Sequence, residues 1–257
     1  MAKVVILCGG KGTRLQEETE FRPKPLVPVG NIPILVHIMQ AYAYHGYKDF
    51  VLCLGYKGEL IKEFFLHREL LANDFSFNLK SGVRKTHGSG SEDWNITFAD
   101  TGLEAQTGAR IKRAEKYIDS DMFLATYGDG LSDVNIAELV KFHRKQNTIG
   151  TMTAVHPHSK YGLIKEGKDS LIDDFVEKPV LYEYINGGFF AFKKEMLDYL
   201  SHDEQCVLEA APLTKLVSEK QLSMHRHEGF WHCMDTYKDY LELNRIWDSG
   251  VIPWKKW

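Results

Sequence analysis

The feature that most constrains the fold of this chain is a short apolar run that opens into a glycine-rich, basic loop. The run VVIL at residues 4–7 leads into GGKGTR at residues 9–14, and PKP follows at residues 23–25. A strand and loop of this kind are typical of α/β proteins that bind nucleotide phosphates, because glycines let backbone N–H groups approach the anion and basic side chains supply charge. The spacing matches neither GxxxxGK(S/T) nor GxGxxG. A tight basic turn without a ligand is the alternative interpretation.

Length, charge and cysteine content narrow the class of protein. A chain of 257 residues with 44% hydrophobic and 26% charged residues is ordinary for a globular protein with a substantial core. Its net charge of −3 argues against a general nucleic-acid binder, which needs a large basic surface. No apolar run approaches the ~20 residues of a membrane span, and the four cysteines form no CxxC pair. We therefore expect a cytoplasmic protein with buried thiols and with no nucleic-acid or membrane partner.

Strand and helix patterns alternate through the first half of the chain. Apolar runs predict strands at 3–8, 50–54, 94–100, 122–127 and 150–155, and amphipathic patterns predict helices from an N-cap at Asn31 to Gly46 and at 59–67, 107–117 and 134–146. Residues 73–93, rich in Gly, Ser and His, are expected to form a mobile loop. This alternation predicts βαβ units in a Rossmann-like α/β fold: a mixed, mainly parallel sheet with helices on both faces.

The second half of the chain is richer in strands. Strands are expected at 162–166, 171–177, 185–192 and 222–227, and helices at 193–200, 207–220 and 236–248. No break in composition and no internal repeat separates the two halves. We therefore expect one domain over residues 1–257, with a smaller, strand-rich substrate-binding lobe in its second part.

Two aspartates stand at positions where an α/β protein could hold a cation. Asp129 follows the strand at 122–127 between two glycines, and Asp235 precedes the last helix. Ligands bind at the carboxyl edge of an open α/β sheet, and Mg²⁺ takes one or two carboxylates together with phosphate oxygens. Both residues are therefore candidates for holding Mg²⁺. The alternatives are a plain turn at 128–130 and an N-cap role for Asp235.

Two further motifs place polar groups near strand ends. In EKP at residues 177–179, the lysine suits a phosphate and the glutamate suits sugar hydroxyls. In NGG at residues 186–188, an amide and two small residues precede an apolar run, which suits close contact with a sugar ring. An exposed charged turn and a strand with a glycine bulge are the respective alternatives.

Together and in this order, the motifs resemble a known family. GG-x-GTR, P-K-P, Y-G-D, E-K-P, N-G-G and M-D-T span residues 9–236, and they are similar to the signature of the sugar-1-phosphate nucleotidylyltransferases. Similarity to the members that use CTP and glucose 1-phosphate lies at residues 17–19, 53–58, 94–95, 100–102, 107–108, 110 and 253–255. Departures at residues 156–160, 180–184 and 210–212 fall where sugar contacts are expected, so the identity of the sugar stays open.

The resemblance implies an activity and its partners. A cytidylyl group passes from CTP to a hexose 1-phosphate, with glucose 1-phosphate as the first expectation, and gives CDP-glucose and pyrophosphate. The product would serve nucleotide-sugar and surface-polysaccharide (O-antigen) biosynthesis. Residues 1–150 would bind mainly the nucleotide, and residues 151–257 mainly the sugar phosphate. The resemblance also implies Mg²⁺ as cofactor and a homo-oligomer, in which a neighbouring subunit could reach the nucleotide.

The positions that match the family's motifs imply roles for individual residues. Arg14 would contact the leaving phosphates, Lys24 would stabilise charge at the α-phosphate, and Asp129 and Asp235 would hold Mg²⁺. The implied nucleotide contacts are Leu7, Gly9, Gly10, Lys11, Gly12, Thr13, Thr107, Arg110 and Gly128. The implied sugar-phosphate contacts are Gly162, Glu177, Lys178, Asn186, Gly187 and Trp231.

Other functions stay open at this point. The same reaction could use UTP or dTTP, or another sugar 1-phosphate. A nucleotide-sugar glycosyltransferase also uses a metal aspartate after a strand, but has no need for GG-x-GTR and P-K-P. A regulatory subunit that only binds nucleotide is the non-enzyme alternative. The aromatic tail from Trp254 to Trp257 suggests a buried interface.

Overall fold

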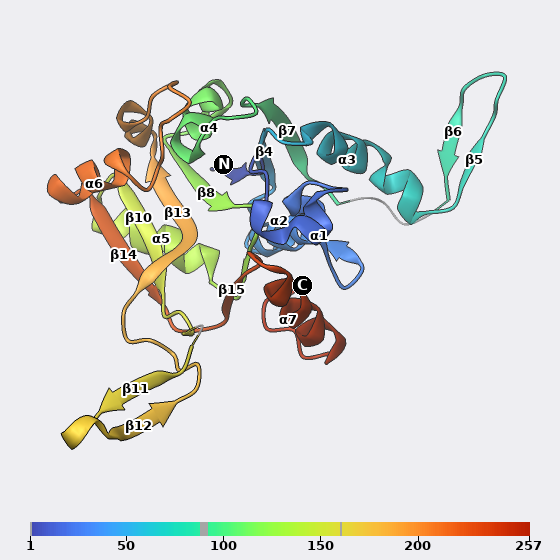
Figure 1. The fold of residues 1–257 in the computed structure, drawn as a ribbon. Coiled ribbons are helices and arrows are strands. Elements are labelled where there is room, and N and C mark those ends of the chain that lie inside the picture. The colour runs from blue at the N-terminus through green and yellow to red at the C-terminus, as the bar shows by residue number, and fades with distance from the viewer. Residues whose placement is uncertain (1, 88–91, 160) are drawn as a thin grey trace.

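A seven-stranded sheet forms the centre of the protein (Figure 1). The structure is a computed structural model and describes residues 2–87, 92–159 and 161–257. The strand order is β14 (Leu222–His227), β10 (Gly150–Val155), β13 (Ile185–Lys193), β8 (Met122–Tyr127), β1 (Lys3–Leu7), β4 (Asp49–Leu54) and β7 (Asn95–Asp100). Strands β8, β1, β4 and β7 are parallel to one another, β10 is parallel to β14, and β13 is antiparallel to both β8 and β10. The predicted mixed, mainly parallel sheet is confirmed.

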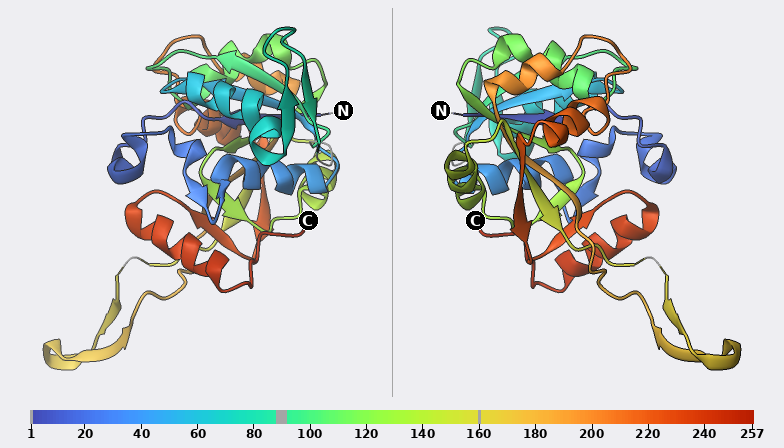
Figure 2. Two further views of the ribbon diagram at one scale, coloured as in Figure 1. Left: turned by 90° about the vertical axis from the view of Figure 1, so that its right-hand side faces the viewer. Right: turned by 90° about the vertical axis from the view of Figure 1, so that its left-hand side faces the viewer.

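Alternating residues of the central strand β1 divide the core into two layers. Val4 and Ile6 belong to a cluster with apolar residues of α2 (Ile34–Tyr44), α3 (Gly58–Ala72), α5 (Ile136–Gln146) and α7 (Tyr237–Asp248). Val5 belongs to a second cluster with residues of α4 (Thr107–Arg113) and α6 (Ala211–Ser218). Because successive side chains of a strand point to opposite faces, helices cover both faces of the sheet, as predicted (Figure 2).

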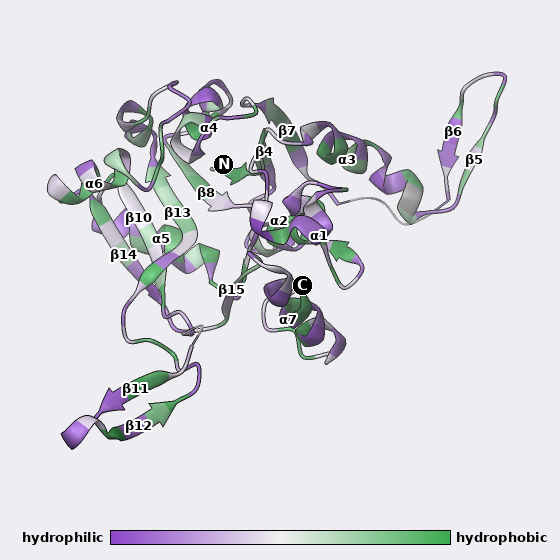
Figure 3. Cartoon of the chain, in the orientation of Figure 1, coloured by the Kyte–Doolittle hydropathy of each residue, from purple (hydrophilic) through white to green (hydrophobic). Residues whose placement is uncertain are grey.

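Two β-hairpins project from this body in different directions (Figure 1). One consists of β5 (Phe75–Phe77) and β6 (Arg84–Thr86). The other consists of β11 (Leu163–Glu166) and β12 (Ile172–Val176); we call residues 161–180 the arm. Figure 3 shows hydrophobic residues on both strands of the arm, and their side chains are exposed.

Two short strand pairs and one short helix lie outside the seven-stranded sheet. The strand β9 (Gly130–Ser132) pairs with β15 (Trp231–Cys233), and β2 (Pro28–Val29) pairs with β3 (Ile32–Pro33). The short helix α1 (Gln16–Thr19) follows the 3₁₀ turn at Thr13–Leu15. The sequence analysis did not predict β2, β3, β9 or β15, because strands of two or three residues carry too little periodicity to be recognised.

Several local predictions differ from the structure. The first long helix begins at Ile34 after Pro33, without a side-chain cap, so the N-cap at Asn31 was wrong. Residues 73–87 of the expected mobile loop contain the β5–β6 hairpin, and residues 88–91 lie outside the described part of the chain. The segment expected as a helix at 193–200 is a 3₁₀ helix over Lys194–Tyr199. The helix expected at 207–220 is shorter, Ala211–Ser218.

The aromatic C-terminal tail packs against its own chain. Trp254 is 1% exposed. Its ring lies 5.4 Å from that of Phe230 and 6.0 Å from that of His37. The suggestion that Trp254 belongs to an interface with another molecule was therefore wrong, because the body of the same chain buries it. Across the described residues, no helix combines the length and apolar character that a bilayer crossing requires.

Candidate active site

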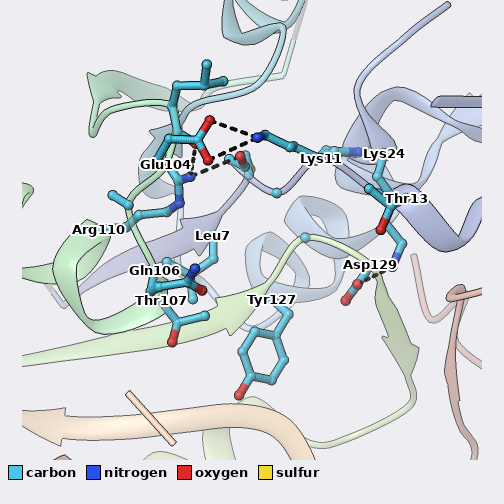
Figure 4. A pocket seen from close by; sticks show the side chains of 18 of the residues that line it. Leu7, Lys11, Thr13, Lys24, Glu104, Gln106, Thr107, Arg110, Tyr127 and Asp129 are labelled. Atoms are coloured by element: carbon cyan, nitrogen blue, oxygen red, sulfur yellow. Dashed lines mark hydrogen bonds and ion pairs between the residues drawn. The ribbon is translucent and has the colours of Figure 1, made fainter. Parts of the chain in front are cut away.

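A cavity of about 450 Å³ lies at the carboxyl edge of the sheet (Figure 4). Leu7 pairs in register with Tyr127 of β8 and Cys53 of β4, so the loops after these strands meet at one edge. The cavity is lined by Leu7, Cys8, Gly9, Gly10, Lys11, Gly12, Thr13, Arg14, Lys24, Pro25, Leu103, Glu104, Ala105, Gln106, Thr107, Arg110, Tyr127, Gly128, Asp129 and Asp235. All residues expected to act in catalysis, nucleotide binding or metal binding are among them.

Glycine is required at two positions of the cavity loops, Gly12 after β1 and Gly128 after β8. Gly12 has a φ of +64°, in the left-handed region that glycine adopts without strain. A Cβ on Gly128 would lie 2.8 Å from the Leu7 carbonyl oxygen. Gly12 therefore lets the first loop turn, and Gly128 lets the loop after β8 pack against the end of β1.

Arg110 fixes the shape of the loop from beneath. Its buried guanidinium donates to the backbone carbonyl oxygens of Leu54, Gly102, Leu103 and Gly9 and to the Thr101 hydroxyl, at 2.7–3.1 Å. A Cβ on Gly9 would lie 2.1 Å from the Arg110 side chain. Only glycine at position 9 therefore leaves room for the Arg110 guanidinium. We expected Arg110 to contact the nucleotide directly. In the structure its donors are engaged by the protein, which makes it a residue that positions the cavity wall.

Lys24 lies between the two aspartates at one end of the cavity. Its Nζ is 2.6 Å from Asp129 Oδ2 and 2.8 Å from Asp235 Oδ1, and its side chain is only 13% exposed. Burial alone would lower the pKa of Lys24, but Coulombic attraction by Asp129 and hydrogen bonds to both carboxylates raise this pKa to about 12. Burial opposes ionisation of Asp235 too, yet its hydrogen bond to Lys24 keeps the pKa of this carboxyl below its ordinary value.

Pairing of β9 with β15 brings the two aspartates together across about a hundred residues of sequence. Asp129 directly precedes β9, and the backbone N–H of Met234 donates to its carbonyl oxygen at 2.9 Å. Asp235 follows two residues after β15 and is not the N-cap of α7. Thr236 caps that helix in a capping box with Asp239, which leaves the Asp235 carboxylate free to face the cavity.

Charged side chains cross the cavity at two further points. Lys11 Nζ lies 2.8 and 2.9 Å from the two carboxylate oxygens of Glu104, which lies on the opposite wall (Figure 4). Arg14 Nη2 lies 3.2 Å from Asp235 Oδ1. Two lysines and an arginine therefore face one small volume, where each is paired with a carboxylate. They can bind a polyanion by exchanging these partners for phosphate oxygens.

A chain of hydrogen bonds at the cavity's edge was missed by the sequence analysis. The Glu209 carboxylate accepts from the Thr107 hydroxyl at 2.6 Å and from the Tyr127 hydroxyl. Asn186 Nδ2 donates to the same tyrosine oxygen at 2.9 Å. Tyr127 was visible in the Y-G-D motif, whereas no sequence signal marks Glu209, because only the fold brings it to the site.

The residues expected to bind the sugar phosphate are spread over two places. Asn186 is close to the cavity through Tyr127, and the Trp231 indole donates to the Gly187 carbonyl oxygen at 2.7 Å. Gly162, Glu177 and Lys178 belong to the arm and do not line the cavity. Lys178 instead pairs with Glu177 at 3.1 Å, and both are exposed. The structure therefore does not bring these three residues to the other predicted site residues.

The two aspartates fit a divalent cation. Their oxygens share the Lys24 ammonium, which shows that the space between them accepts one cation. Oxygen donors beside a cavity open to phosphate are the ligands that Mg²⁺ prefers.

The chain is similar to known proteins along nearly its whole length. The family model described as nucleotidyl transferase matches residues 3–249. A glucose-1-phosphate cytidylyltransferase from Salmonella typhimurium is 41% identical over 257 residues, covering 99% of each chain. A mannose-1-phosphate guanyltransferase from Yarrowia lipolytica is 33% identical, over 97% of this chain and 65% of its own length.

A solved structure of UDP-glucose pyrophosphorylase complexed with UDP-glucose superposes with a TM-score of 0.70 at 15% identity, over 97% of this chain and 99% of that one. At this identity the likeness shows the fold. The family model covers nearly the whole chain, and the relatives are similar end to end. This protein therefore belongs to the nucleotidyl transferase family.

Proposed function

We propose that the enzyme transfers a cytidylyl group from CTP to glucose 1-phosphate and releases CDP-glucose and pyrophosphate. The observation that carries the proposal is the group of Lys24, Asp129 and Asp235 at one end of a cavity rimmed by Lys11 and Arg14. The end-to-end similarity to glucose-1-phosphate cytidylyltransferases supports the choice of CTP and glucose 1-phosphate.

The chemistry needs positioning and charge neutralisation. A phosphate oxygen of glucose 1-phosphate attacks the α-phosphorus of CTP, and the bond from that phosphorus to the oxygen bridging the α- and β-phosphates breaks, so that pyrophosphate leaves. The attacking phosphate is already ionised at neutral pH, so no general base is required. Backbone N–H groups of residues 9–12 and the side chains of Lys11 and Arg14 hold the triphosphate, and Lys24 stabilises charge at the α-phosphate.

Lys24 must exchange partners for this role. In the structure its ammonium is held by the two carboxylates. Asp129 and Asp235 would hold Mg²⁺ in its place, which frees Lys24 for the phosphate. The bound ion neutralises phosphate charge and orients the triphosphate.

The sugar phosphate approaches from the side of the second half of the chain. Tyr127 lines the cavity and accepts a hydrogen bond from Asn186, and the Trp231 indole bonds to the neighbouring Gly187. We propose that residues 1–150 mainly bind the nucleotide and that residues 151–257 mainly bind the sugar phosphate within one domain. Glu177 and Lys178, together with Gly162, contact the sugar phosphate when the arm is held against the site.

The reaction is tested by pyrophosphate release. Each of CTP, UTP, dTTP and GTP is paired with several sugar 1-phosphates, with and without Mg²⁺. CTP with glucose 1-phosphate and Mg²⁺ should give the highest kcat/KM, and CDP-glucose should accumulate in equal amount to pyrophosphate. A higher kcat/KM for another nucleotide or sugar would replace the proposed substrates. Turnover of CDP-glucose without pyrophosphate would contradict the reaction itself.

We also propose that the enzyme is a homo-oligomer in the cytoplasm. The four free cysteines support a reducing compartment. An isolated two-stranded hairpin is marginally stable in water, yet on the arm Ile164, Leu171, Ile172 and Phe175 are 58–69% exposed. A second copy of this chain would cover this apolar surface. Contact between the arm and that second copy would hold Glu177 and Lys178 near a sugar phosphate.

Sedimentation tests the assembly. The wild type should sediment as a multimer of the 29.5 kDa chain, and a double variant with Ile164→Ser and Phe175→Ser should sediment as a smaller species. The matched control is Val217→Ser, an exposed apolar residue of α6 on the body, and it should leave the assembly unchanged. A monomeric wild type would overturn the proposal.

A further inference from the structure

Cys233 lies beside the two aspartates and has no role in the proposed reaction. Its Sγ and one carboxylate oxygen each of Asp129 and Asp235 all lie within 4.8 Å of one another. Thiolate and carboxylate ligands of tetrahedral Zn²⁺ are separated by roughly 3.5 Å, so small side-chain rotations would bring the three atoms onto one ion. This donor set differs from an all-oxygen magnesium site, because sulfur favours Zn²⁺ and related ions over Mg²⁺.

The backbone holds the three ligand-bearing residues in place. Cys233 is in register with Gly130 in the β9–β15 pair, and the Met234 N–H donates to the Asp129 carbonyl oxygen. The donor set is therefore tied together by strand pairing. Both carboxylates also line the cavity, which gives an ion a path from solvent.

A cation already occupies part of this site. The Lys24 ammonium lies 2.6 Å from Asp129 Oδ2 and 2.8 Å from Asp235 Oδ1. A divalent ion carries twice that charge and takes the same two oxygens. It gains the sulfur as a third ligand only if it is thiophilic, so the thiol distinguishes Zn²⁺ from Mg²⁺.

Binding through sulfur requires loss of the thiol proton. This proton passes to solvent as the metal–sulfur bond forms.

We propose that Asp129, Cys233 and Asp235 form a three-ligand site for thiophilic divalent cations such as Zn²⁺, and that filling it inhibits the enzyme. Three protein ligands leave a tetrahedral ion one open position, whereas Mg²⁺ on two carboxylates keeps several for phosphate oxygens and water. Only the inhibition rests on the proposed function, since binding is measurable without turnover.

Co²⁺ is the probe for binding, because a cobalt–thiolate bond gives a near-ultraviolet charge-transfer absorption that oxygen ligands do not give. The metal-free wild type should show this band at one equivalent of Co²⁺, and Zn²⁺ should remove it. Cys233→Ser should abolish the band, whereas Cys206→Ser, at a half-buried cysteine of the body, should keep it. No band in the wild type, or a band that persists in Cys233→Ser, would overturn the site.

Inhibition is measured separately, in the CTP assay with saturating Mg²⁺. The Zn²⁺ concentration for half-inhibition should rise at least tenfold in Cys233→Ser, and a chelator should restore the wild type. Equal sensitivity of the two proteins would contradict inhibition through Cys233. Thermal unfolding checks that the variant folds, with Cys233→Ala as a second test. If no substrate pair gives turnover, the proposed function fails while the cobalt band still decides the metal site.

Discussion

The cavity wall and the arm are built in opposite ways. The wall includes the loops at the ends of β1, β7 and β8, and the buried Arg110 binds four carbonyl oxygens and a hydroxyl beneath it. The arm is two strands whose residues are all exposed, and at its base the two chain segments bond to each other, as from Ser159 N to Pro179 O.

One chain by itself therefore assembles the proposed nucleotide and metal site, but it does not bring the arm to that site. The residues proposed for nucleotide and metal binding are held in one volume by packing and hydrogen bonds. Glu177 and Lys178 of the arm pair with each other instead. Variants of the wall should therefore act strongly on turnover or stability, whereas variants of the arm should act on one substrate and on assembly.

The largest effect is expected from Lys24→Ala. Removal of this cation should lower kcat/KM roughly 10²- to 10³-fold, or ~3–4 kcal/mol, by analogy with loss of a hydrogen-bond donor to a transition state. Initial rates with CTP and glucose 1-phosphate measure it. Lys141→Ala, at an exposed lysine of α5, is the matched control. Near-normal turnover of Lys24→Ala in a cooperatively folded protein would contradict its catalytic role.

Arg110→Lys should damage the wall without removing its charge. A lysine lacks the planar fork that satisfies several carbonyl oxygens at once, so buried acceptors lose partners at a cost of roughly 2–3 kcal/mol in unfolding free energy. Urea denaturation measures this loss, and the KM for CTP should rise as the Gly9 loop shifts. A weaker CTP affinity with unchanged stability would instead indicate direct contact with the nucleotide.

Acid should destabilise the body through two buried histidines. Burial is the main cause that lowers the pKa of His37 and of His143 to about 4, below the ordinary value near 6.5. Their contribution to stability is therefore full above pH 6.5 and is lost as pH falls through 4. At pH 5 each should contribute about 2 kcal/mol less than at pH 7.

Urea denaturation at the two pH values measures this loss. His37→Gln should reduce the loss of unfolding free energy between pH 7 and pH 5 by the contribution of one histidine. The arm has no histidine, so the effect belongs to the body. Equal stability of the wild type at pH 7 and pH 5 would refute the prediction.

The smallest effect is expected from Lys178→Ala on the arm. It should raise the KM for glucose 1-phosphate about tenfold, or ~1.4 kcal/mol, with the KM for CTP unchanged. Lys165→Ala is the matched control, because Lys165 is an exposed lysine of the same arm that pairs with Asp173 at 3.4 Å. If both variants behave alike, Lys178 has no particular role toward the sugar phosphate.

Local sequence patterns predicted much of the fold and one end of the site. Each of these patterns is local: an apolar run predicts β1, β4 or β8 from about six consecutive residues, and the glycines follow β1 directly. Such patterns can be recognised in the sequence without knowledge of the fold. The motif order also predicted that residues near positions 10, 24, 128 and 235 belong together. The structure places them around one cavity.

The chain by itself therefore determined the sheet, its helices and the residue types at its carboxyl edge, because periodicity and turn chemistry are local properties. Only the tertiary structure decided the contacts that these residues make and the further residues that join them. Pairing of β9 with β15 joins Asp129, Cys233 and Asp235, and the capping box at Thr236 frees Asp235. Such contacts depend on long-range packing, and long-range packing leaves no periodic trace in a sequence.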